Sequence, residues 1–513
     1  MLGWTVRCLV AGALGVALAI PDALAQNRER PPRRAPAATA EGTTPIAAPR
    51  PPGTAQRNAV PQGSVPLTLP EAVFLAVRSN RSIRGQYLQR VADRFSLRVA
   101  EARFDPQFGI AGGVTHQRVG SITTTQTTLT PNVTIATVTG GQFTFGWQGA
   151  QTNVRGQNPT ATGRATFQVI QPLLAGGGID YAMAPVRIAR IQEVNSKLQL
   201  KALVIDQISQ TILAYRALLQ AQEQLRISDE ALRRARELAS VNVALAEAGR
   251  LAQVELIQAE TSIAQQELAL VGARNAHQQA RIALLTLLAV DQSQQIWAVE
   301  RPAAESARVA PDRALQAASE NQPDYLRTVL GIEIARINLD VARNQRLWDV
   351  SFVAGSSLAG QRADLARTVD ALTSARSDFN VGLQVNIPIG QIARQQPEVN
   401  ATVALRQSQI ALEGARDRLR QQVEDTVRNI DTLRRQAELA RRARELAGMQ
   451  LETELVKLQA GRSSNFQVVS FQGSLQSAES TELAAVIAYA NALTTLDQIL
   501  GTTLDTWRIY LND

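Results

Sequence analysis

The chain has 513 residues, a formal net charge of +8 and only 4% aromatic residues, and its length allows about two to four domains. Nearly all of the positive charge is arginine that alternates with acidic residues, as in Arg441, Arg442, Arg444 and Glu445. Such alternation is typical of solvated helix faces with ion pairs. No basic patch with interleaved aromatic residues is found, which argues against nucleic-acid binding.

The first 25 residues have the pattern of a secretory signal peptide. Arg7 precedes a short apolar run, Leu9–Ile20, and Ala23–Ala25 fits a small-x-small cleavage site, which predicts cleavage after Ala25. The run is too short to span a membrane. The only cysteine, Cys8, precedes this run, whereas the cysteine of a lipid anchor would follow it. The mature chain is therefore expected to have no lipid anchor and no disulfide.

Residues 26–66 are rich in Pro, Ala, Arg and Thr and contain few large apolar side chains. This composition predicts a disordered leader. Beyond it, no stretch reaches the roughly 18 uninterrupted apolar residues that a membrane helix needs. Contact with a membrane would therefore have to be made by β-strands.

The rest of the chain contains an internal duplication. Three segments recur in the same order: Pro70–Asn80 with Pro311–Asn321, Gln171–Leu173 with Ile387–Ile389, and Glu247–Arg250 with Gln459–Arg462. Their separations shrink from 241 to 216 to 212 residues, so the first copy carries the longer insertions. Three matches in order indicate two repeats, residues 67–300 and residues 301–513.

Each repeat reads as a helix, strands, a very long helix, a glycine turn and a further helix. The expected helices are about Pro70–Arg103, Ile179–Ala248, Leu251–Val290, Pro311–Leu347, Pro397–Ala460 and Ser463–Leu500. In the longest, Leu218, Leu225 and Leu232 lie seven residues apart, and a second seam position holds Ala214, Ala221 and Ala235. This heptad with small residues allows close helix packing. A 70-residue helix extends roughly 100 Å, whereas a membrane core is about 30 Å thick.

The segments between the helices alternate in the manner of β-strands. Phe379, Val381, Leu383, Val385 and Ile387 alternate with polar residues, and Phe143, Phe145 and Trp147 alternate with Thr144 and Gly146. A membrane β-barrel strand of about 9–11 residues has this pattern, and so does a half-buried sheet in a soluble domain. The signal peptide and the long helices favour the barrel.

The sequence offers candidates for the aromatic girdles of such a barrel: Phe108, Trp147, Trp348, Phe352 and Phe379. Two strand pairs cannot close a barrel, and open sheet edges do not occur in lipid. Several copies of the chain must therefore close the sheet together. Four strands from each of three chains would give twelve, within the known range of even-numbered barrels.

Over about Leu67–Leu500 the sequence strongly resembles the TolC family of outer-membrane efflux and secretion channels. The resemblance rests on the helix start Leu67–Ala72, on Gln171–Leu174 followed by Gly176–Gly178, and on the turns Ala248–Leu251 and Ala460–Ser463. It implies a mostly α fold with β, in which long antiparallel α-helical hairpins form a periplasmic α-barrel tunnel. It also implies a trimeric transmembrane β-barrel with four strands per chain.

The same resemblance implies a function and partners. The chain would be the exit duct of a tripartite efflux pump or a type I secretion system, in the outer membrane of a Gram-negative bacterium. It would act as a homotrimer docked onto a periplasmic adaptor and an inner-membrane transporter. An iris-like movement of the paired helices would open the duct.

Candidate residues follow from the family pattern. The tips that would contact the adaptor are Gly249, Arg250, Leu251, Gly461, Arg462 and Ser463. The barrel-to-tunnel junction would contain Pro172, Gly176, Gly177, Gly178, Pro388 and Gly390. Plain helix termination also accounts for the tip glycines, since glycine readily adopts the left-handed cap conformation.

The pore entrance of the family often carries acidic side chains three residues apart, beginning six residues beyond the second tip glycine. The same count gives Gln467 and Ser470 in the second repeat, and Glu255 and Gln258 in the first. The second repeat thus departs from the acidic pattern. Glu255 is either an acidic residue at the mouth or an ordinary exposed helix carboxylate.

Catalytic and metal-binding patterns are not found in the sequence. The only histidines are His116 and His277, and His277 continues the stripe Leu256, Ile263 and Leu270, which favours a packed or tunnel-facing residue. No spacing suggests a metal site or a Ser/His/Asp triad, and Gly176–Gly178 lacks the GK[ST] of a phosphate loop. No enzyme activity, metal or cofactor is expected.

Two other classes of protein remain open. A periplasmic coiled-coil adaptor or scaffold would be soluble without detergent and would need no barrel. An exported enzyme on a helical framework would need a convergent polar site, and the sequence indicates none.

Overall fold

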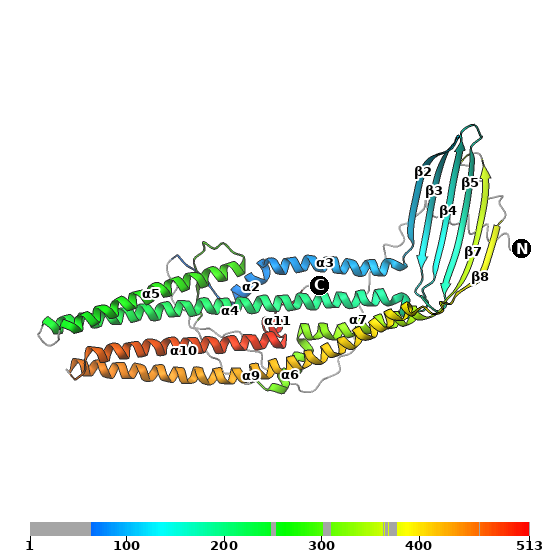
Figure 1. Cartoon of the computed structure of the whole chain (residues 1–513). Coiled ribbons are helices and arrows are strands. Elements are labelled where there is room, and N and C mark those ends of the chain that lie inside the picture. The colour runs from blue at the N-terminus through cyan, green and yellow to red at the C-terminus, as the bar shows by residue number, and fades with distance from the viewer. Residues whose placement is uncertain are drawn as a thin grey trace, which may run out of the picture. The chain divides into compact units, whose positions relative to one another are not determined.

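The computed structural model describes residues 63–247, 253–300, 309–362, 364, 368, 377–460 and 462–511 (Figure 1). The expected signal peptide and nearly all of the leader lie outside these residues. The chain divides into two compact units. Unit 1 takes its described residues from 101–185 and 340–398, and unit 2 takes them from 63–100, 186–339 and 399–511.

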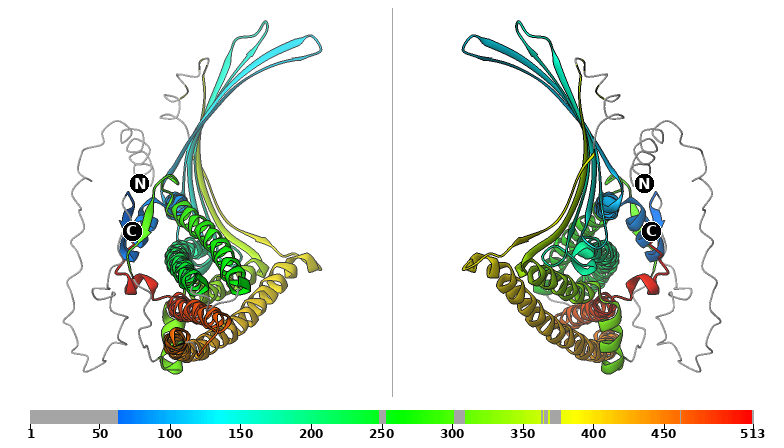
Figure 2. Two further views of the ribbon diagram at one scale, coloured as in Figure 1. Left: turned by 90° about the vertical axis from the view of Figure 1, so that its left-hand side faces the viewer. Right: turned by 90° about the vertical axis from the view of Figure 1, so that its right-hand side faces the viewer.

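Unit 1 contains a twisted, fully antiparallel sheet of six strands (Figure 2). Their order is β2 (Gln107–Val119), β3 (Ile122–Ala136), β4 (Gln142–Val154), β5 (Thr160–Pro172), β7 (Asp349–Arg362) and β8 (Ser377–Asn386). Each strand is hydrogen-bonded to the next in this order. Short turns with a left-handed glycine, Gly120 and Gly156, connect β2 to β3 and β4 to β5.

In the described residues the sheet contains six strands, two more than the four expected in the barrel from each chain. The Gly- and Thr-rich insertion of the first repeat folds into two hairpins, β2–β3 and β4–β5, whereas the second repeat contributes one, β7–β8. Threonine and valine favour extended backbone, and most of this insertion has alternating side chains that suit a sheet with two different faces.

Both repeats begin with a broken helix rather than with the single helix expected. In the first, α2 (Leu69–Ser79) ends at Asn80, and α3 (Arg81–Glu101) follows at once. Asn80 has extended backbone, and its side-chain oxygen accepts from the backbone N–H of Ser82 at 2.8 Å, which caps α3. A short 3-10 helix, η2 (Ala102–Phe104), then leads to the sheet.

The second repeat breaks at the corresponding position. Here α6 (Pro311–Asn321) ends at the extended residue Gln322, and α7 (Pro323–Arg346) begins at a proline. A proline disfavours helical backbone at the residue before it, so Pro323 favours a break at Gln322. The duplication thus extends to the interruption of these helices.

Four long helices run side by side in unit 2 (Figure 1). They are α4 (Ile179–Glu247), α5 (Gln253–Leu288), α9 (Gln396–Gln459) and α10 (Asn465–Leu500), each within a few residues of its expected bounds. A 3-10 turn, η3 (Ile392–Gln395), precedes α9, and α11 (Thr503–Thr506) follows α10. The 69 residues of α4 extend roughly 100 Å.

The helices of unit 2 pack through the expected heptad seams. Leu218, Leu232 and Ala235 of α4 are buried, and Leu218 joins Leu284 of α5 and Ile487 of α10 in the largest apolar cluster. This cluster also covers a small parallel sheet of β1 (Val65–Leu67) and β6 (Ile296–Ala298). Strand β1 includes the last two residues of the expected leader.

Among the described helices, only α10 is long and apolar enough to meet the length and composition of a membrane span. Its side chains Leu483 and Ile487 pack in the cluster with α4 and α5, and Tyr489 and Leu496 pack against Ile430 of α9. These contacts are those of a core helix in unit 2.

Candidate functional site

The six-stranded sheet has one apolar and one polar face. Because directly opposite residues in a sheet share a face, the strand register defines rows that cross all six strands. One row, in strand order, is Phe108, Val133, Phe145, Phe167, Ser356 and Phe379. The adjacent row on the other face is Gln107, Thr134, Thr144, Gln168, Gly355 and Asn380.

The apolar face forms a band across the sheet. Neighbouring rows add Ile110, Trp147 and Leu358 on one side of the first row, and Ile135, Phe143, Val169 and Val381 on the other. Aromatic residues therefore occur on this face, as the girdle interpretation predicts for Phe108, Trp147, Phe352 and Phe379. Trp348 lies just before β7.

The band is exposed in the single chain. Phe108, Ile110 and Phe379 expose 79, 80 and 82% of their surface. A contiguous apolar patch of this kind marks contact with a partner or a membrane. The row of polar side chains on the opposite face suits contact with water.

A compact turn leads from β5 to α4 and contains the expected junction glycines. Gly176 and Gly178 have φ angles of 81° and 97°, and an added Cβ at Gly177 would lie 2.5 Å from the carbonyl oxygen of Pro172. Larger residues are therefore excluded at these three positions. Asn344 closes the turn, since its side chain accepts from the Gly176 N–H at 2.7 Å and donates to the Gly177 carbonyl at 2.9 Å.

The corresponding turn of the second repeat is built differently. Gly390 has a φ of 74°, and Pro388 precedes it by two residues. Arg394 of η3 pairs with Asp349 at the start of β7 at 2.8 Å. The sequence indicated the glycines and prolines of both turns, but it did not indicate that Asn344 and Arg394 stabilise them. Both act across long sequence separations that no local pattern reveals.

The far ends of the helical hairpins are only partly described. Gly249, Arg250, Leu251 and Gly461 lie outside the described residues, so their expected role at the tips stays a prediction. Arg462 is exposed and Ser463 is partly buried just before α10. Both line an open hollow of about 690 Å³ between α9 and α10, together with Glu454, Lys457 and Gln467.

Glu454 holds the end of α9 to the start of α10. The Ser463 hydroxyl donates to its carboxylate, and Lys457 pairs with it at 3.1 Å. These two contacts, with the Ser463 hydrogen bond the larger, lower the pKa of the Glu454 carboxyl. Next to it, Ser464 caps α10 by accepting from the backbone N–H of Gln467 at 3.3 Å.

We expect Glu454→Gln to loosen the start of α10 at neutral pH, because the amide cannot replace the charge that Lys457 and Ser463 stabilise. In the unchanged protein, the depressed pKa means that the contact is present above the unfolded pKa of Glu and is lost as pH falls through the folded pKa. Hydrogen exchange of residues 462–470, corrected for the intrinsic pH dependence, measures both effects. Glu452→Gln, on an exposed position of the same helix, is the control and is expected to leave exchange unchanged.

Two buried asparagines join the same region to α4. Asn242 donates to the side-chain oxygen of Asn465 at 2.8 Å, and both are fully buried. Asn465 in turn donates to the backbone carbonyl of Glu255 at 3.4 Å, so α4, α5 and α10 meet here. A signal for this link exists in the sequence, because Asn242 follows Ala235 by seven residues and puts a polar side chain at an apolar seam position.

The expected entrance residues differ in how far they are exposed. Gln467 and Ser470 are exposed on the first turns of α10. Glu255 and Gln258 lie on the first turns of α5 and are half-buried, and Glu255 Oε2 is buried without a hydrogen-bond partner among the described residues. This partial burial does not fit the alternative in which Glu255 is an ordinary exposed helix carboxylate.

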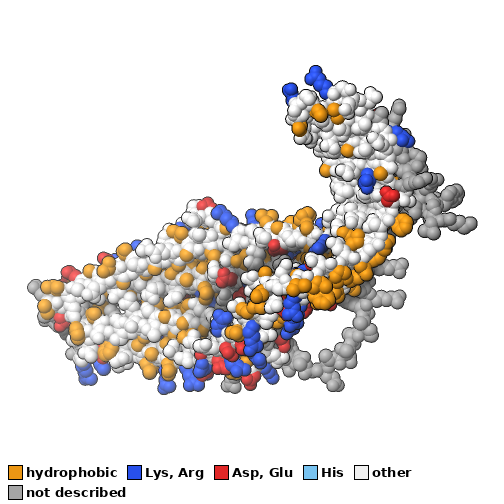
Figure 3. Space-filling view, turned by 45° about the vertical axis from the view of Figure 1, so that its right-hand side comes forward, with side chains coloured by type: hydrophobic (Ala, Val, Ile, Leu, Met, Phe, Trp, Pro, Cys, Tyr) orange, Lys and Arg blue, Asp and Glu red, His pale blue; other side chains and the backbone are white. Residues whose placement is uncertain are grey.

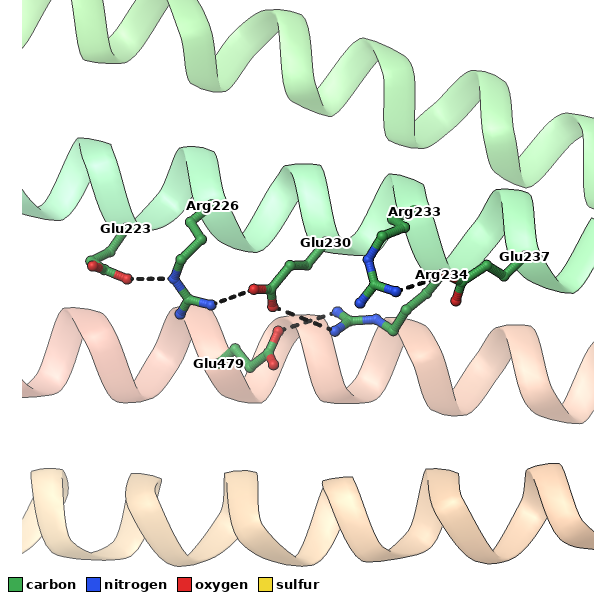
Figure 4. A network of polar contacts seen from close by, with 7 residues as sticks. All are labelled: Glu223, Arg226, Glu230, Arg233, Arg234, Glu237 and Glu479. Carbon is green, nitrogen blue, oxygen red and sulfur yellow. Dashed lines mark hydrogen bonds and ion pairs between the residues drawn. The ribbon is translucent and has the colours of Figure 1, made fainter. Parts of the chain in front are cut away.

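Ion pairs connect the long helices further from their ends. Along α4, Glu223, Arg226, Glu230 and Arg234 form a chain with distances of 2.8, 2.7 and 4.0 Å, and Arg234 reaches Glu479 of α10 at 3.3 Å (Figure 4). Arg444 pairs α9 with Glu482 of α10 at 2.6 Å. Acidic and basic side chains are mixed on the surface shown in Figure 3, as expected for ion-paired helix faces.

We expect the Arg234–Glu479 pair to contribute a coupling free energy of about 1 kcal/mol, because both side chains are more than four-fifths buried. The exposed pair Arg233–Glu237 on the same helix is the matched control, with an expected coupling of about 0.3–0.5 kcal/mol. Double-mutant cycles with Arg→Met and Glu→Gln, read by chemical unfolding in detergent, measure both values. Equal coupling in the two pairs would contradict the argument from burial.

A half-buried arginine makes a further link between α4 and α10. Arg216 donates to the Ala490 carbonyl at 2.6 Å and to the Thr494 hydroxyl at 2.8 Å. Burial lowers its pKa to about 10, so it is still charged at neutral pH. The link therefore joins a charged guanidinium of α4 to oxygen acceptors of α10.

Histidine chemistry does not contribute to these links. His277 packs against Trp297 with ring centroids 5.5 Å apart, and burial, followed by the nearby Arg281, lowers its pKa. His116 shares a hydrogen bond with Thr125 across β2 and β3. In the described parts of the chain, no group of three or more His, Cys, Asp or Glu residues is placed to hold a metal ion.

Comparison with protein families gives a match to the second repeat. Residues 314–502 match the model of the outer membrane efflux protein family. The match begins in α6 and ends just after α10, so the whole of the second repeat's helical hairpin and its β7–β8 hairpin lie within it. No curated protein matches the sequence of this chain.

Solved structures of outer-membrane channels share the fold of this chain. VceC from Vibrio cholerae is 14% identical with a TM-score of 0.65, and 84% of this chain covers 96% of that one. CmeC from Campylobacter jejuni is 15% identical with a TM-score of 0.64, at coverages of 84 and 85%. The open state of MtrE from Neisseria gonorrhoeae is 16% identical with a TM-score of 0.65, at coverages of 87 and 94%.

Proposed function

We propose that this protein is the outer-membrane exit duct of an efflux pump or a type I secretion system, and that it acts as a homotrimer. The observation that carries the proposal is the pair of rows that cross the sheet, apolar on one face and polar on the other. A membrane barrel needs its apolar band toward lipid and its polar face toward a water-filled lumen. The match of residues 314–502 to the outer membrane efflux protein family supports efflux across the outer membrane as the activity.

The sheet of one chain has two free edges, β2 and β8. Unpaired backbone groups at an edge cannot be satisfied in lipid, so closure by further copies of the chain accounts for the exposed band without leaving an edge. The long helices supply the other part of the duct. A helix of about 100 Å is several times longer than a membrane core of about 30 Å, which suits a tunnel that crosses the periplasm.

The helical hairpins would dock onto a periplasmic adaptor and an inner-membrane transporter. The tip residues named from the sequence, Gly249 to Leu251 and Gly461 to Ser463, are the proposed contact region. Opening would separate the paired helices, and the links through Glu454, Asn242 and Arg234 are the contacts that such a movement has to loosen.

Fractionation and conductance test the proposal. The protein is expected in the outer-membrane fraction, soluble only with detergent, and it is expected to form ion-conducting channels in planar lipid bilayers. A water-soluble, non-conducting protein in the periplasmic fraction would instead support the adaptor or scaffold alternative. Loss of drug or protein export on deletion of the gene, restored by the unchanged chain, would establish the transport role.

The entrance residues make a separate prediction. If Gln467 and Ser470 line the narrow end of the duct, the double variant Gln467→Glu, Ser470→Glu is expected to shift the reversal potential in a salt gradient toward cation preference. Two added carboxylates at a constriction attract cations by direct Coulomb interaction. Gln476→Glu, nine residues beyond Gln467 and therefore on the opposite side of α10, is the control. An equal shift with the control would remove these residues from the entrance.

A further inference from the structure

The first repeat of this protein contributes one hairpin more than the second, and that hairpin belongs to the sheet itself. β2 and β3 are 13 and 15 residues long, longer than the roughly 9–11 residues that cross a membrane. β2 pairs with β3 over its full length, from Gln107 with Thr134 to Val119 with Ile122. The hairpin is therefore continuous with β4 and is not a loop above it.

The pairing of β3 with β4 supports this continuity. The register runs from Thr124 opposite Val154 to Ala136 opposite Gln142, and it skips only Thr130 and Pro131. Proline has no N–H to donate to a ladder, which explains the gap. Pairing resumes on both sides of it, so β4 is an interior strand along nearly its whole length.

The side chains of the hairpin continue both faces of the sheet. Phe108, Val133 and Leu129 extend the apolar band, and Gln107, Thr134 and Thr130 extend the polar face. A hairpin outside a barrel would not need one apolar face and one polar face. Its apolar band needs the same lipid contact as that of β7 and β8.

The two edge strands, β2 and β8, have few of the features that prevent an edge from pairing with another strand. The edge strand β2 has no charged residue from Gln107 to Gln117 and no proline, and β8 has a single charge, Asp378. Proteins usually protect a free edge with charges, prolines or bulges. All ten residues of β8 are exposed, as are all but Gly109 in β2.

From these observations we propose that β2 of one copy pairs with β8 of the next, so that the trimer closes a barrel of eighteen strands. The inference rests on the proposed function, which supplies the three copies. Because each chain contributes an even number of antiparallel strands, β8 and the neighbouring β2 run antiparallel, and their apolar faces point the same way. Barrel diameter grows about linearly with strand number, so this barrel is about 1.5 times as wide as one of twelve strands.

A wider barrel changes what limits passage through the duct. The barrel of eighteen strands is in the range of porins with an open aqueous channel. The bottleneck then lies in the helical part, and the barrel end offers room for large or bulky cargo. The added hairpin thus widens the exit of the channel and leaves the number of tunnel helices unchanged.

Cysteine cross-linking tests the strand order directly, because the mature chain is expected to contain no cysteine of its own. Two full-length double variants place one cysteine on each free edge, Gly113→Cys with Asn380→Cys and Thr115→Cys with Asn380→Cys. All three positions lie on the polar face, and two β2 positions allow for the shift in register that strand tilt imposes. The matched control, Gln148→Cys with Asn380→Cys, uses the polar face of β4.

Oxidation in native outer membranes is expected to give covalent dimers and trimers for at least one β2–β8 pair and only monomers for the control. Cross-linking in the β4–β8 control instead would mean that twelve strands close the barrel. That result would overturn the inference and leave the proposed channel intact. Heat-sensitive trimers that cross-link in none of the variants would also overturn it. A sheet that closed on itself would give only intramolecular cross-links, and together with the absence of trimers this would refute the proposed assembly as well.

Discussion

Val381→Arg is expected to prevent stable insertion of the protein, with a cost of about 2–4 kcal/mol in each copy, the range measured for a basic side chain at the bilayer midplane of a barrel. Val381 lies in the apolar band of β8, opposite Ala354, and exposes 66% of its surface in the single chain. A guanidinium at this position would have to leave water for hydrocarbon. The yield of heat-modifiable trimers in the outer-membrane fraction measures the effect.

The neighbouring residue offers a matched control. Asn380 is adjacent in the chain but lies on the polar face, opposite Gly355, so Asn380→Arg places the same charge toward the proposed lumen. We expect normal trimer yield for this variant. Equal loss with both variants would show that β8 tolerates no arginine for reasons other than lipid contact, and equal tolerance would argue against a membrane-facing band.

Gly501→Val is expected to lower the free energy of unfolding of the helical part by about 3 kcal/mol. Gly501 caps α10 with φ at 72°, and an added Cβ would lie 2.5 Å from the Asn321 carbonyl oxygen at the end of α6. Left-handed backbone costs a residue with a Cβ roughly 1–2 kcal/mol, and overpacking adds about 1–3 kcal/mol. Displacing Asn321 would also break the 3.1 Å hydrogen bond that its carbonyl accepts from Lys201.

Chemical unfolding in detergent, followed by helical circular dichroism, measures this loss. The control is Gly473→Ala on the same helix, where nothing lies within 4 Å of an added Cβ. That variant is expected to gain about 0.5–1 kcal/mol, since alanine loses less backbone entropy than glycine in a helix. If Gly501→Val unfolds at the same denaturant concentration as the unchanged protein, the cap is not under the steric constraint described.

The long helices were predictable from the sequence to within a few residues because their signal is periodic and repeated. The heptads around Leu218 and Leu232 specify both the helix and its buried side, and the structure buries both residues. The breaks at Asn80 and Gln322 were missed, although Pro323 carries a local signal for one of them. At Asn80 the cap is a local hydrogen bond that competes with helix continuation, but the same side chain also donates to Gln207 of α4, a contact that no local pattern reveals.

The six strands of the described sheet were not predicted, for a different reason. The Thr-rich stretch of β3 alternates only weakly in hydrophobicity, since much of both its faces is threonine, so the pattern does not show how many times the chain crosses the sheet. Pairing with β2 and β4 decides that. Asn344 and Arg394 are likewise not apparent from local sequence, because each stabilises a turn through partners that are distant in the chain.

The sequence by itself determined the long helices and the alternation of a two-faced sheet, and it predicts the export signal and the duplication, because each is a local or periodic property of the side chains. Only the tertiary structure decided the number of strands, the edges β2 and β8, and the polar links among α4, α5, α9 and α10. These features arise from pairings between residues far apart in the chain. Such pairings are selected by packing and by the need to satisfy backbone hydrogen bonds, and no single segment contains them.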